Sequence, residues 1–493
     1  MQTQFDILIV GGGGSGLAAA VSAAECGASV LLLEKHPELG GATGIAVGSF
    51  TANRTRLQQQ AGVQDSLQAH AEDAGHFAPP EIEKRNNAEL RRWFLDHSAD
   101  TLHWLLSMGL HFQGPNPEPP NRLPRMHNVV PGAKAYIAVL HARLVKLGGS
   151  VLTAAPVVEI TRNAGRVNGV IAQVNGERIQ FTAKRGVVLA AGDYANSPEL
   201  IARFKGGQFA DIEGINPRAS GDGHVLAERV GAKLVNMDVT YGPEIRFVPP
   251  KKKTFQQLLP TRGPLSGLIG AAAPYLPQAV MSGLIRRLLV TWQHPENALF
   301  TDCAILVNQR GERFCDESKW PDREIAIARQ PGKVAYLLLD GRLVQRYSAW
   351  PHFISTAPKI AYAYAHDYVR LRPDIAFQAG TLQQAAEKCG LPAAAMQRSV
   401  DQANRSSVET GRPTLSSGPW LILGPAKAYF TTTEGGAAIN RQFQVLDEND
   451  APIPGLYAAG QNGLGGQILW GHGLHIAWAM TSGRLAGKML AGH

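Results

Sequence analysis

A strand, a glycine-rich turn and a helix follow one another at the beginning of the sequence. The apolar run Ile7 to Val10 is long enough for a buried strand, and it leads directly into the pattern G-x-G-x-x-G. The next segment, Leu17 to Cys26, is rich in alanine and lacks proline, so it predicts a helix with Gly27 at its C-cap. This order of elements predicts the first unit of a dinucleotide-binding α/β domain.

The spacing of three glycines and one acid has a physical explanation. Gly11 allows the tight turn, Gly13 lets the backbone approach a pyrophosphate, and Gly16 lets helix and strand pack closely. The pyrophosphate lies at the helix N-terminus, where N–H groups without helical partners and the helix dipole favour negative charge. A second strand, Ala28 to Leu33, ends at Glu34, and an acid at this distance can accept a hydrogen bond from a ribose hydroxyl.

This pattern serves both NAD and FAD, and the residues after Glu34 decide between them. A second loop of small residues, Gly40 to Gly44, follows the acid. A cofactor that crosses the domain needs another close backbone approach at about this place. Here the chain resembles the flavoproteins of the succinate dehydrogenase/fumarate reductase family, which includes the 3-ketosteroid dehydrogenases.

Further segments extend the resemblance along nearly the whole chain. Residues 186–193 (GVVLAAGD) resemble the family's strand beside the flavin, although Asp193 stands at a position that is usually glycine. Residues 453–460 (IPGLYAAG) are a strong family marker, and the helix that begins near Gly473 resembles the one whose N-terminus faces the N1–C2=O edge of the flavin. The resemblance implies non-covalent FAD, with contacts from Gly11, Gly13, Gly14, Ser15, Gly16, Glu34, Lys35, Gly41, Ala42, Thr43, Gly44, Val157, Ala191, Gly192, Asp222, Gly460, Gln461, Gly473, Leu474 and Ile476.

The expected fold is α/β with two units. A Rossmann-like FAD-binding domain, split in sequence, comprises residues 1–242 and 428–493, and an α+β cap or catalytic domain, residues 243–427, is inserted between them. Within the cap, Ala279 to Trp292 has one apolar face, which predicts an amphipathic helix. We expect this helix to pack on the cap, or to form a lid over an apolar substrate opening that also touches a membrane surface.

Periodicity and turn residues predict several smaller elements. They are a mainly helical region over residues 49–112, a proline-rich loop over 114–124, a helix over 135–147, an antiparallel insertion over 150–185, a strand-turn-strand unit over 304–314 and a helix that runs through Gly483.

Composition narrows the class of protein. The chain has 493 residues and a formal charge of +8, but its basic residues are dispersed apart from Lys251 to Lys253, which argues against nucleic-acid binding. The positive field would favour anionic substrates. The four cysteines lack metal-type spacing, so we expect no metal site and reduced thiols in a cytoplasmic protein. No signal peptide or membrane-spanning run is expected.

The family implies interconversion of C–C and C=C bonds beside a carbonyl or carboxylate, with hydride exchanged at the flavin. Fumarate reductases use two histidines and two arginines around a dicarboxylate. Those positions fall near Pro243–Glu244, Thr431–Thr432 and Trp470, and Arg323 is about two residues out of register with the remaining arginine. Unpaired dicarboxylate charges in a dry site are costly, so fumarate and succinate are disfavoured.

The C-terminal segment Gly471 to Gly483 looks more like the ketosteroid dehydrogenases, in which a glycine N–H is donated to the substrate ketone. Gly473 matches that glycine, but Leu469 and Trp470 replace the tyrosine and proline beside it. A strict ketosteroid 1-dehydrogenase is therefore not supported either.

The sequence predicts an FAD-dependent dehydrogenase or reductase of a mostly apolar, cyclic or steroid-like carbonyl compound, with a tryptophan-lined pocket and an unidentified electron acceptor. Candidates for proton transfer or carbonyl binding are Arg323, His472, His475 and Tyr241, with the Gly473 N–H as a further donor. Structural roles compete with these: an ion pair with Asp316 or Glu317 for Arg323, and a helix cap for His472. The alternatives are a reductase of an α,β-unsaturated carboxylate, with Arg323 and a second cation at the flavin, and a non-catalytic electron carrier.

Overall fold

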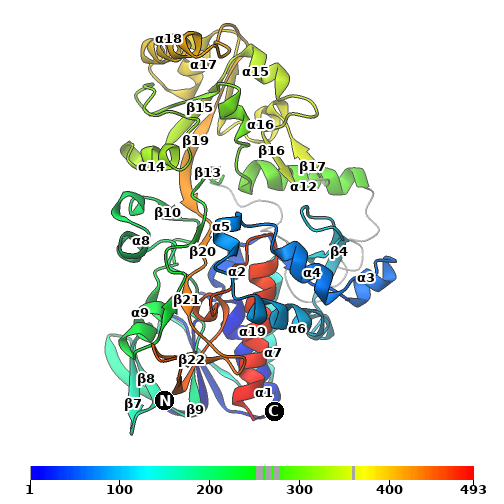
Figure 1. Ribbon diagram of the computed structural model, residues 1–493, viewed down its shortest axis with the longest axis vertical. Coiled ribbons are helices and arrows are strands. Elements are labelled where there is room, and N and C mark those ends of the chain that lie inside the picture. Colours follow the sequence, from blue (N-terminus) through cyan, green and yellow to red (C-terminus); the bar gives the residue numbers. More distant parts are fainter. Residues whose placement is uncertain (1, 251–258, 261–268, 270–277, 358–360, 493) are drawn as a thin grey trace.

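The computed structural model describes residues 2–250, 259–260, 269, 278–357 and 361–492. Two lobes are stacked along the long axis, and both chain ends lie in the lower lobe (Figure 1). The lower lobe is built on a sheet of strand order β22-β23-β9-β1-β2-β6, parallel except for the β22–β23 pair. Its strands are β1 (Gln4–Val10), β2 (Val30–Leu33), β6 (Ser150–Leu152), β9 (Glu177–Leu189), β22 (Gln444–Leu446) and β23 (Pro452–Ala458).

The predicted opening unit is confirmed. Helix α1 (Gly14–Glu25) begins inside the glycine pattern, three residues before the predicted start, and Gly27 follows its end with φ +82°. Strands β1 and β2 pair in parallel, as the βαβ unit requires. The α/β fold class is confirmed.

The predicted antiparallel insertion over 150–185 was wrong at both ends. Strand β6 pairs in parallel with β2, and β9 is one long strand that pairs with the hairpin first and with β1 afterwards. Only β7 (Val157–Asn163), β8 (Arg166–Val174) and the first half of β9 form the insertion. Alternation along a strand does not reveal which strand it will pair with, so the pattern could not place these limits.

Helix α19 (Leu474–Leu490) crosses α1 at very close range, as Figure 1 shows. A Cβ atom on Gly483 or Gly487 would lie 2.2 Å from a backbone oxygen of α1. The helix continues seven residues beyond its predicted end at Gly483, because its later residues also pack on α1 and the sheet. The close packing brings the N-termini of α1 and α19 to the same cavity.

The upper lobe has its own sheet and hydrophobic core. The long strand β19 (Trp420–Phe430) pairs with β10, β13, β15 and β18, and β14 pairs with β15. Side chains from residues 194–219, before the inserted segment, also contribute to this core. The other strands are β10 (Glu213–Gly214), β13 (Glu244–Phe247), β14 (Ile305–Val307), β15 (Ala335–Leu339) and β18 (Ala376–Ala379).

Helices surround the upper sheet. The predicted amphipathic helix is confirmed as α12 (Gln278–Trp292), whereas Lys251 to Lys253 lie outside the described residues. The predicted strand-turn-strand over 304–314 is wrong in its second half, which makes only a single bridge from Arg313 to Val307. The helices are α8 (Pro198–Phe204), α13 (Ala298–Thr301), α14 (Asp322–Ala328), α15 (Gly341–Arg346), α16 (Ala365–Leu371), α17 (Leu382–Cys389) and α18 (Ala393–Glu409). Helix α9 (Asp222–Arg229) lies instead in the lower lobe, next to β7.

The segment between β2 and β6 is mainly helical, as predicted, and includes a three-stranded sheet that the sequence did not reveal. Its strands are β3 (Ser49–Thr51), β4 (His111–Asn116) and β5 (Met126–Val130), and its helices are α2 (Gly41–Ile45), α3 (Arg56–Gln60), α4 (Leu67–Ala74), α5 (Pro80–Glu83), α6 (Ala88–Ser107) and α7 (Lys134–Lys146). Short two-stranded pairs complete the fold: β11 (Leu234–Val235) with β21 (Gly436–Ala437), β12 (Thr240–Tyr241) with β20 (Thr432–Thr433), and β16 (Ser355–Ala357) with β17 (Ala361–Ala363).

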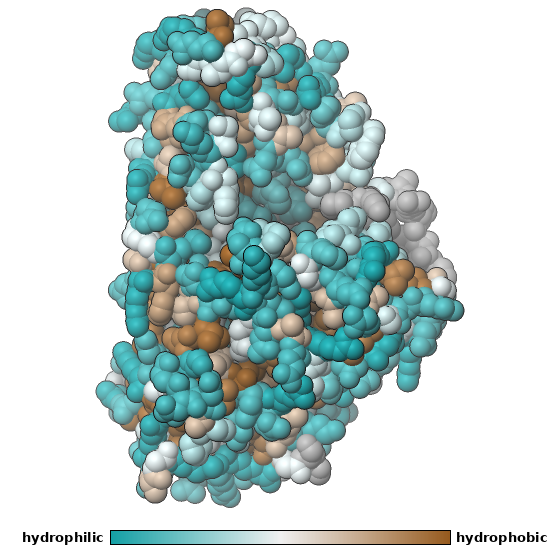
Figure 2. Space-filling model, in the orientation of Figure 1, coloured by the Kyte–Doolittle hydropathy of each residue, from teal (hydrophilic) through white to brown (hydrophobic). Residues whose placement is uncertain are grey.

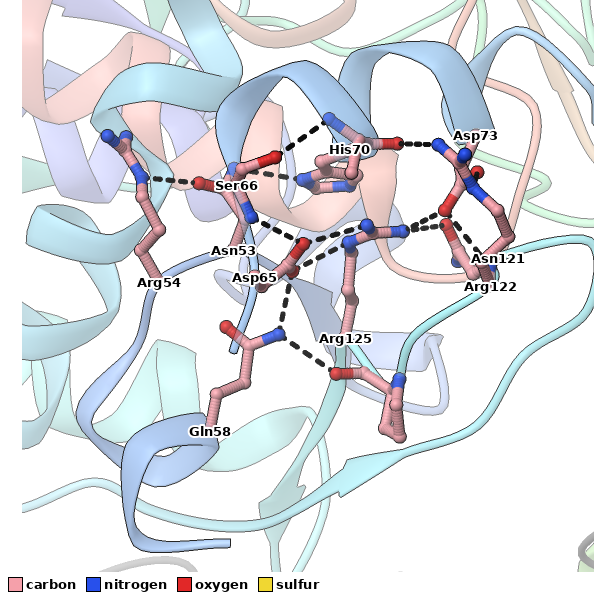
Figure 3. Close-up of polar contacts among 12 residues, drawn as sticks. Asn53, Arg54, Gln58, Asp65, Ser66, His70, Asp73, Asn121, Arg122 and Arg125 are labelled. Carbon is pink, nitrogen blue, oxygen red and sulfur yellow. Dashed lines mark hydrogen bonds and ion pairs between the residues drawn. The ribbon is translucent and has the colours of Figure 1, made fainter. Parts of the chain in front are cut away.

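A buried ionic cluster joins these helices to the loop before β5 (Figure 3). Arg125 has a fully buried side chain and pairs with Asp65 at 2.7 Å and Asp73 at 2.5 Å, both also fully buried. Burial alone would raise the pKa of Asp65, but hydrogen bonds from Arg125 and Gln58 lower it on balance. The stability that Asp65 contributes is therefore present above the unfolded pKa of about 3.9 and is lost as the pH falls through the lower folded value.

We expect Arg125→Met to lower the free energy of unfolding by about 3–5 kcal/mol, because it leaves the buried carboxylate of Asp65 without its cation and Asp73 with Arg122 alone. Arg54→Met is the matched control, since Arg54 pairs with Asp96 at the surface, where ion pairs contribute about 0–1 kcal/mol. Urea unfolding followed by circular dichroism at pH 7 measures both variants. Equal midpoints for the two would contradict the structural role of the cluster.

Candidate active site

A cavity of about 390 Å³ lies where the two lobes meet. One end is lined by the G-x-G-x-x-G turn and Glu34, and the other by side chains from β13, the end of α12 and β19. The first turn of α19 lines it as well. The face of the molecule shown in Figure 2 is mostly hydrophilic, with scattered apolar residues.

The glycine turn has the geometry that a dinucleotide requires. A Cβ on Gly11 would lie 2.4 Å from the Ala190 oxygen, and one on Gly16 would lie 1.8 Å from the Gly11 oxygen, so neither position admits a side chain. Gly13 differs, because its nearest neighbour would be 3.9 Å away and its φ is an ordinary −82°. The fold itself therefore does not require glycine at position 13, and the close approach of a phosphate explains it.

Glu34 is buried at the same end of the cavity. Its two carboxylate oxygens accept hydrogen bonds from the main-chain N–H groups of Gly12, at 2.7 Å, and His36, at 2.9 Å. These bonds fix the carboxylate beside the glycine turn, where its remaining lone pairs can accept from ribose hydroxyls. The neighbouring Lys35 ammonium is paired with Asp222 at 2.8 Å.

Two helix N-termini open on the cavity. Neither α1 nor α19 has a side-chain hydrogen bond at its N-cap, which is Gly13 in one and Gly473 in the other. A Cβ on Gly473 would lie 2.7 Å from the Thr51 hydroxyl oxygen, so this turn also needs glycine. Two positive helix ends in one cavity suit a ligand with a diphosphate and a second electron-rich group.

These features fit FAD. The glycine turn and the α1 N-terminus would hold the pyrophosphate, Glu34 the ribose, and the α19 N-terminus the ring. Of the predicted contacts, Gly11, Gly13, Gly14, Ser15, Glu34, Lys35, Gly41, Ala42, Thr43, Ala191, Gly192, Gln461, Gly473 and Ile476 line the cavity. The structure places Gly16, Gly44, Val157, Asp222, Gly460 and Leu474 outside the lining.

Sequence reasoning missed one residue that shapes this wall. Asn462 accepts a hydrogen bond from the Ala191 N–H at 2.6 Å and donates to the Gly192 oxygen at 3.1 Å, so it fixes the turn after β9. It follows the strong IPGLYAAG marker by two residues, and that position was the available signal.

Arg246 on β13 is the second missed residue, and it lines the upper end of the cavity. Its guanidinium pairs with Glu244 at 2.8 Å and approaches the Thr431 hydroxyl at 3.3 Å. Burial alone would raise the pKa of Glu244, but the positive charges of His294 and Arg246 lower it on balance. Phe247, Pro249 and Tyr429 supply apolar surface beside the guanidinium.

His472 also lines the cavity, and its side chain is 53% exposed. Its Nδ1 lies 2.8 Å from the carboxylate of Glu118, which is itself buried. Burial alone would lower the pKa of His472, but the hydrogen bond and the charge of Glu118 raise it on balance. The structure therefore gives His472 a buried anionic partner. The expected role as a helix cap is not seen, because the N-cap of α19 is Gly473 and no side chain makes a capping hydrogen bond there.

Tyr241 and His475 are two further polar residues of the lining. Burial raises the pKa of Tyr241, so its phenol keeps its proton at neutral pH, and its hydroxyl has no hydrogen-bond partner among the described residues. His475 Nε2 lies 2.8 Å from the fully buried Glu434, which also accepts from the Leu469 N–H.

Arg323 is not brought to the cavity. Its buried guanidinium pairs with Glu324 at 2.6 Å, donates to the Glu317 main-chain oxygen at 3.0 Å and stacks on Phe300. The cation expected at Arg323 is thus supplied to the cavity by Arg246. The ion-pair partner of Arg323 is also not one of the two expected acids, since Arg313 pairs with Glu317.

The expectation of a tryptophan-lined pocket was wrong for the part of the chain that the structure describes. Trp470 packs behind Tyr241, with ring centroids 5.1 Å apart, and Trp320 donates its indole N–H to the Pro243 oxygen on the outside of the cap. Neither Trp470 nor Trp320 lines the cavity. Tyr241, which does, lies between the cavity and Trp470.

A match to the protein family described as FAD binding domain covers residues 6–468. The chain belongs to this family. The predicted family resemblance is confirmed at this level, and with it the flavin as cofactor.

Two similar proteins have the names of oxidoreductases. NADH:fumarate oxidoreductase of Klebsiella pneumoniae is 26% identical over 511 residues, covering 99% of this chain and 48% of the relative. This chain thus spans about half the length of that relative. Urocanate reductase of Eggerthella lenta is 28% identical over 489 residues, covering 94% of this chain and 70% of the relative. Both relatives are named for the reduction or oxidation of their substrates, and both align with nearly the whole of this chain.

Solved structures share the fold. The open conformation of a flavocytochrome c3 fumarate reductase aligns with a TM-score of 0.73 at 24% identity, covering 99% of this chain and 78% of that one. The 3-ketosteroid-Δ4-(5α)-dehydrogenase of Rhodococcus jostii aligns with a TM-score of 0.60 at 23% identity, covering 100% and 98%. At these identities the likeness to ketosteroid dehydrogenases extends to the fold alone.

From the sequence we also expect no metal site, reduced cysteines and no membrane-spanning run. Among the described residues no cluster of histidine, cysteine and acidic side chains could hold a metal ion, and all four cysteines are free. None of the helices in the described ranges combines the length and the apolar character that crossing a membrane requires.

Proposed function

We propose that the chain reduces a C=C bond conjugated to a carboxylate, in a substrate with one anionic end and an apolar body, and that it holds FAD without a covalent bond. The observation that carries the proposal is the position of Arg246 in the cavity wall, among apolar side chains and beside the paired His472. A guanidinium in such a place is suited to a planar anion.

The names of the relatives support the carboxylate reading over the ketone reading that the sequence favoured. Fumarate and urocanate are both α,β-unsaturated carboxylates, and these compounds appear in the names of relatives that align with nearly the whole chain. A monocarboxylate suits the cavity better than a dicarboxylate, because of the two arginines among the described lining residues, Arg246 and Arg218, the second lies near His36 at the nucleotide end. A second carboxylate buried at the upper end would be left without a guanidinium.

Residues of the chain have separate roles in the proposed reaction. FAD, when bound, supplies the hydride acceptor and donor. Arg246 and His472 hold the substrate carboxylate and stabilise the negative charge that grows on its oxygens as hydride adds to the distant alkene carbon. Tyr241 delivers a proton to the other carbon, since its phenol is protonated and opens on the cavity. The cap residues around Arg246 exclude water.

Rapid reoxidation of the photoreduced, FAD-loaded protein tests this proposal. Under anaerobic conditions it is mixed with cinnamate, methyl cinnamate, 4-phenyl-3-buten-2-one or fumarate, and the flavin absorbance is followed. We expect cinnamate to reoxidise the flavin faster than its neutral ester and the ketone, and faster than the dicarboxylate. Faster reoxidation by the ketone would restore the ketosteroid-like alternative, and a preference for fumarate would show that a second carboxylate is accommodated.

A further inference from the structure

Glu118 lies on the proline-rich loop between β4 and β5, 354 residues from His472 in sequence, yet it contacts His472 twice. One carboxylate oxygen, Oε1, accepts from the His472 main-chain N–H at 2.6 Å and lies 2.8 Å from the ring Nδ1. The Glu118 side chain is 6% exposed, so the pair is shielded from water on the carboxylate side. The attraction between the two groups is therefore screened less than in a pair with both side chains at the surface.

Strand β3 holds the other side of the same residue. The Thr51 hydroxyl donates to the His472 main-chain oxygen at 2.8 Å, and the Thr51 N–H donates to the Gly473 oxygen at 3.3 Å. The backbone of His472 is thus fixed at both its N–H and its C=O group. With Nδ1 at Glu118, the ring presents Nε2 away from the loop, and Nε2 has no hydrogen-bond partner among the described residues.

The buried ionic cluster of Figure 3 fixes both supporting segments. Arg125 donates to Asn121 at 3.0 Å, and the Arg122 N–H donates to Asp73 at 3.0 Å, so the loop that carries Glu118 is anchored three and four residues away. The Arg125 main-chain oxygen accepts from the Ala52 N–H, next to Thr51. The cluster therefore connects the loop and β3 beneath His472.

We propose that Glu118 is a positioning residue that keeps the His472 imidazole charged and directs its Nε2–H into the cavity, toward the anionic oxygen of the substrate. This inference rests on the proposed function and assigns the second cation of the carboxylate site. Arg246 comes from the cap and His472 from the FAD-binding lobe, so the carboxylate would be held between the two lobes.

The charged groups near His472 determine whether its pKa is raised or lowered. Glu118 on the loop and Glu244 on β13 favour the imidazolium, whereas Arg246 on β13 opposes it. Because the folded pKa is raised, the charged form persists above the ordinary pKa of about 6.5 and is lost as the pH rises through the folded value. Removing the Glu118 charge should therefore make His472 lose its proton at lower pH.

Glu118→Gln tests this inference, because the amide oxygen can still accept both hydrogen bonds while the charge is gone. Histidine ring signals of the FAD-loaded, non-turning-over protein are titrated by NMR, with His472 assigned by its absence in His472→Asn. We expect the midpoint of His472 to fall by about one pH unit or more. Glu177→Gln, on an exposed hairpin strand, is the matched control and should leave the midpoint unchanged.

A second measurement links the pair to the substrate. The dissociation constant of the saturated product 3-phenylpropionate, at a pH midway between two midpoints one unit apart, should rise about threefold in Glu118→Gln, because the charged fraction of His472 falls from about three quarters to about one quarter, and that of its amide should not change. Glu118→Asp, which keeps the charge, should retain most of the carboxylate affinity, and this variant is informative even if Glu118→Gln folds poorly.

The outcomes separate this inference from the proposed function. An unchanged His472 midpoint overturns the role of Glu118, and a lowered midpoint with unchanged carboxylate affinity overturns the contact between His472 and the substrate. Failure of the proposed function shows instead in the wild-type protein, as absence of reoxidation by cinnamate.

Discussion

Gly13→Asp is expected to yield a folded protein without FAD. The φ of Gly13 is ordinary, and a Cβ there would lie 3.9 Å from the nearest atoms, an ordinary van der Waals contact, so the fold tolerates a side chain at this position. The new carboxylate would, however, stand at the α1 N-terminus where the pyrophosphate binds, so it would both fill the site and repel the diphosphate. We expect the FAD dissociation constant to rise by about 10²- to 10³-fold, or roughly 3–4 kcal/mol.

Fluorescence titration with FAD measures this change, and circular dichroism verifies the fold. Gly207→Asp is the matched control, since Gly207 has open space around its Cβ position and lies outside the cavity. If Gly13→Asp bound FAD like the control, the glycine turn would not be the pyrophosphate site.

Arg246→Met is expected to lower kcat/KM for the carboxylate substrate by about 10²- to 10³-fold, corresponding to roughly 3–4 kcal/mol of lost transition-state stabilisation. The reason is the position of the guanidinium, which lies in the cavity wall with Phe247 and Pro249 beside it. The loss should be much smaller for the neutral ester, because an ester carries no charge for a cation to bind. Steady-state rates with both substrates provide the comparison.

Removal of Arg246 also leaves the carboxylate of Glu244 without its arginine partner, with His294 and the Thr431 hydroxyl beside it, and this effect needs its own control. The double variant Arg246→Met/Glu244→Gln removes both charges. We expect it to remain as impaired with the carboxylate substrate as the single variant. Recovery of activity in the double variant would mean that the unpaired Glu244, and not the missing guanidinium, caused the loss.

The sequence predicted the lower lobe well because its signals are local. The G-x-G-x-x-G turn, its flanking strand and helix, and the acid at Glu34 lie within one short segment, and the main-chain N–H of Gly12 binds Glu34 inside it. Gly16 is required by a contact with Gly11 in the same segment. The amphipathic pattern of α12 is equally local. The ends of the hairpin over 150–185 failed because strand pairing depends on residues far away in the sequence.

The upper end of the site could not be predicted in the same way. Arg246 and Glu118 stand in segments without a motif, and they reach the cavity only through the register of β13 with β19 and through the anchored loop before β5. Arg323 matched a family position approximately, but a neighbouring acid, Glu324, and the main-chain oxygen of Glu317 bind its guanidinium inside the cap. A shift of two residues in sequence reverses the direction of a side chain on a helix, and an approximate register is therefore insufficient.

The most direct test of the account is a crystal structure of the FAD-loaded protein with 3-phenylpropionate bound. We predict that the carboxylate lies between the Arg246 guanidinium and His472 Nε2, with the Tyr241 hydroxyl facing the carbon next to the carboxylate and the flavin ring on the opposite side. A carboxylate bound elsewhere, with no contact to the Arg246 guanidinium, would contradict the assignment of this cavity to a conjugated carboxylate.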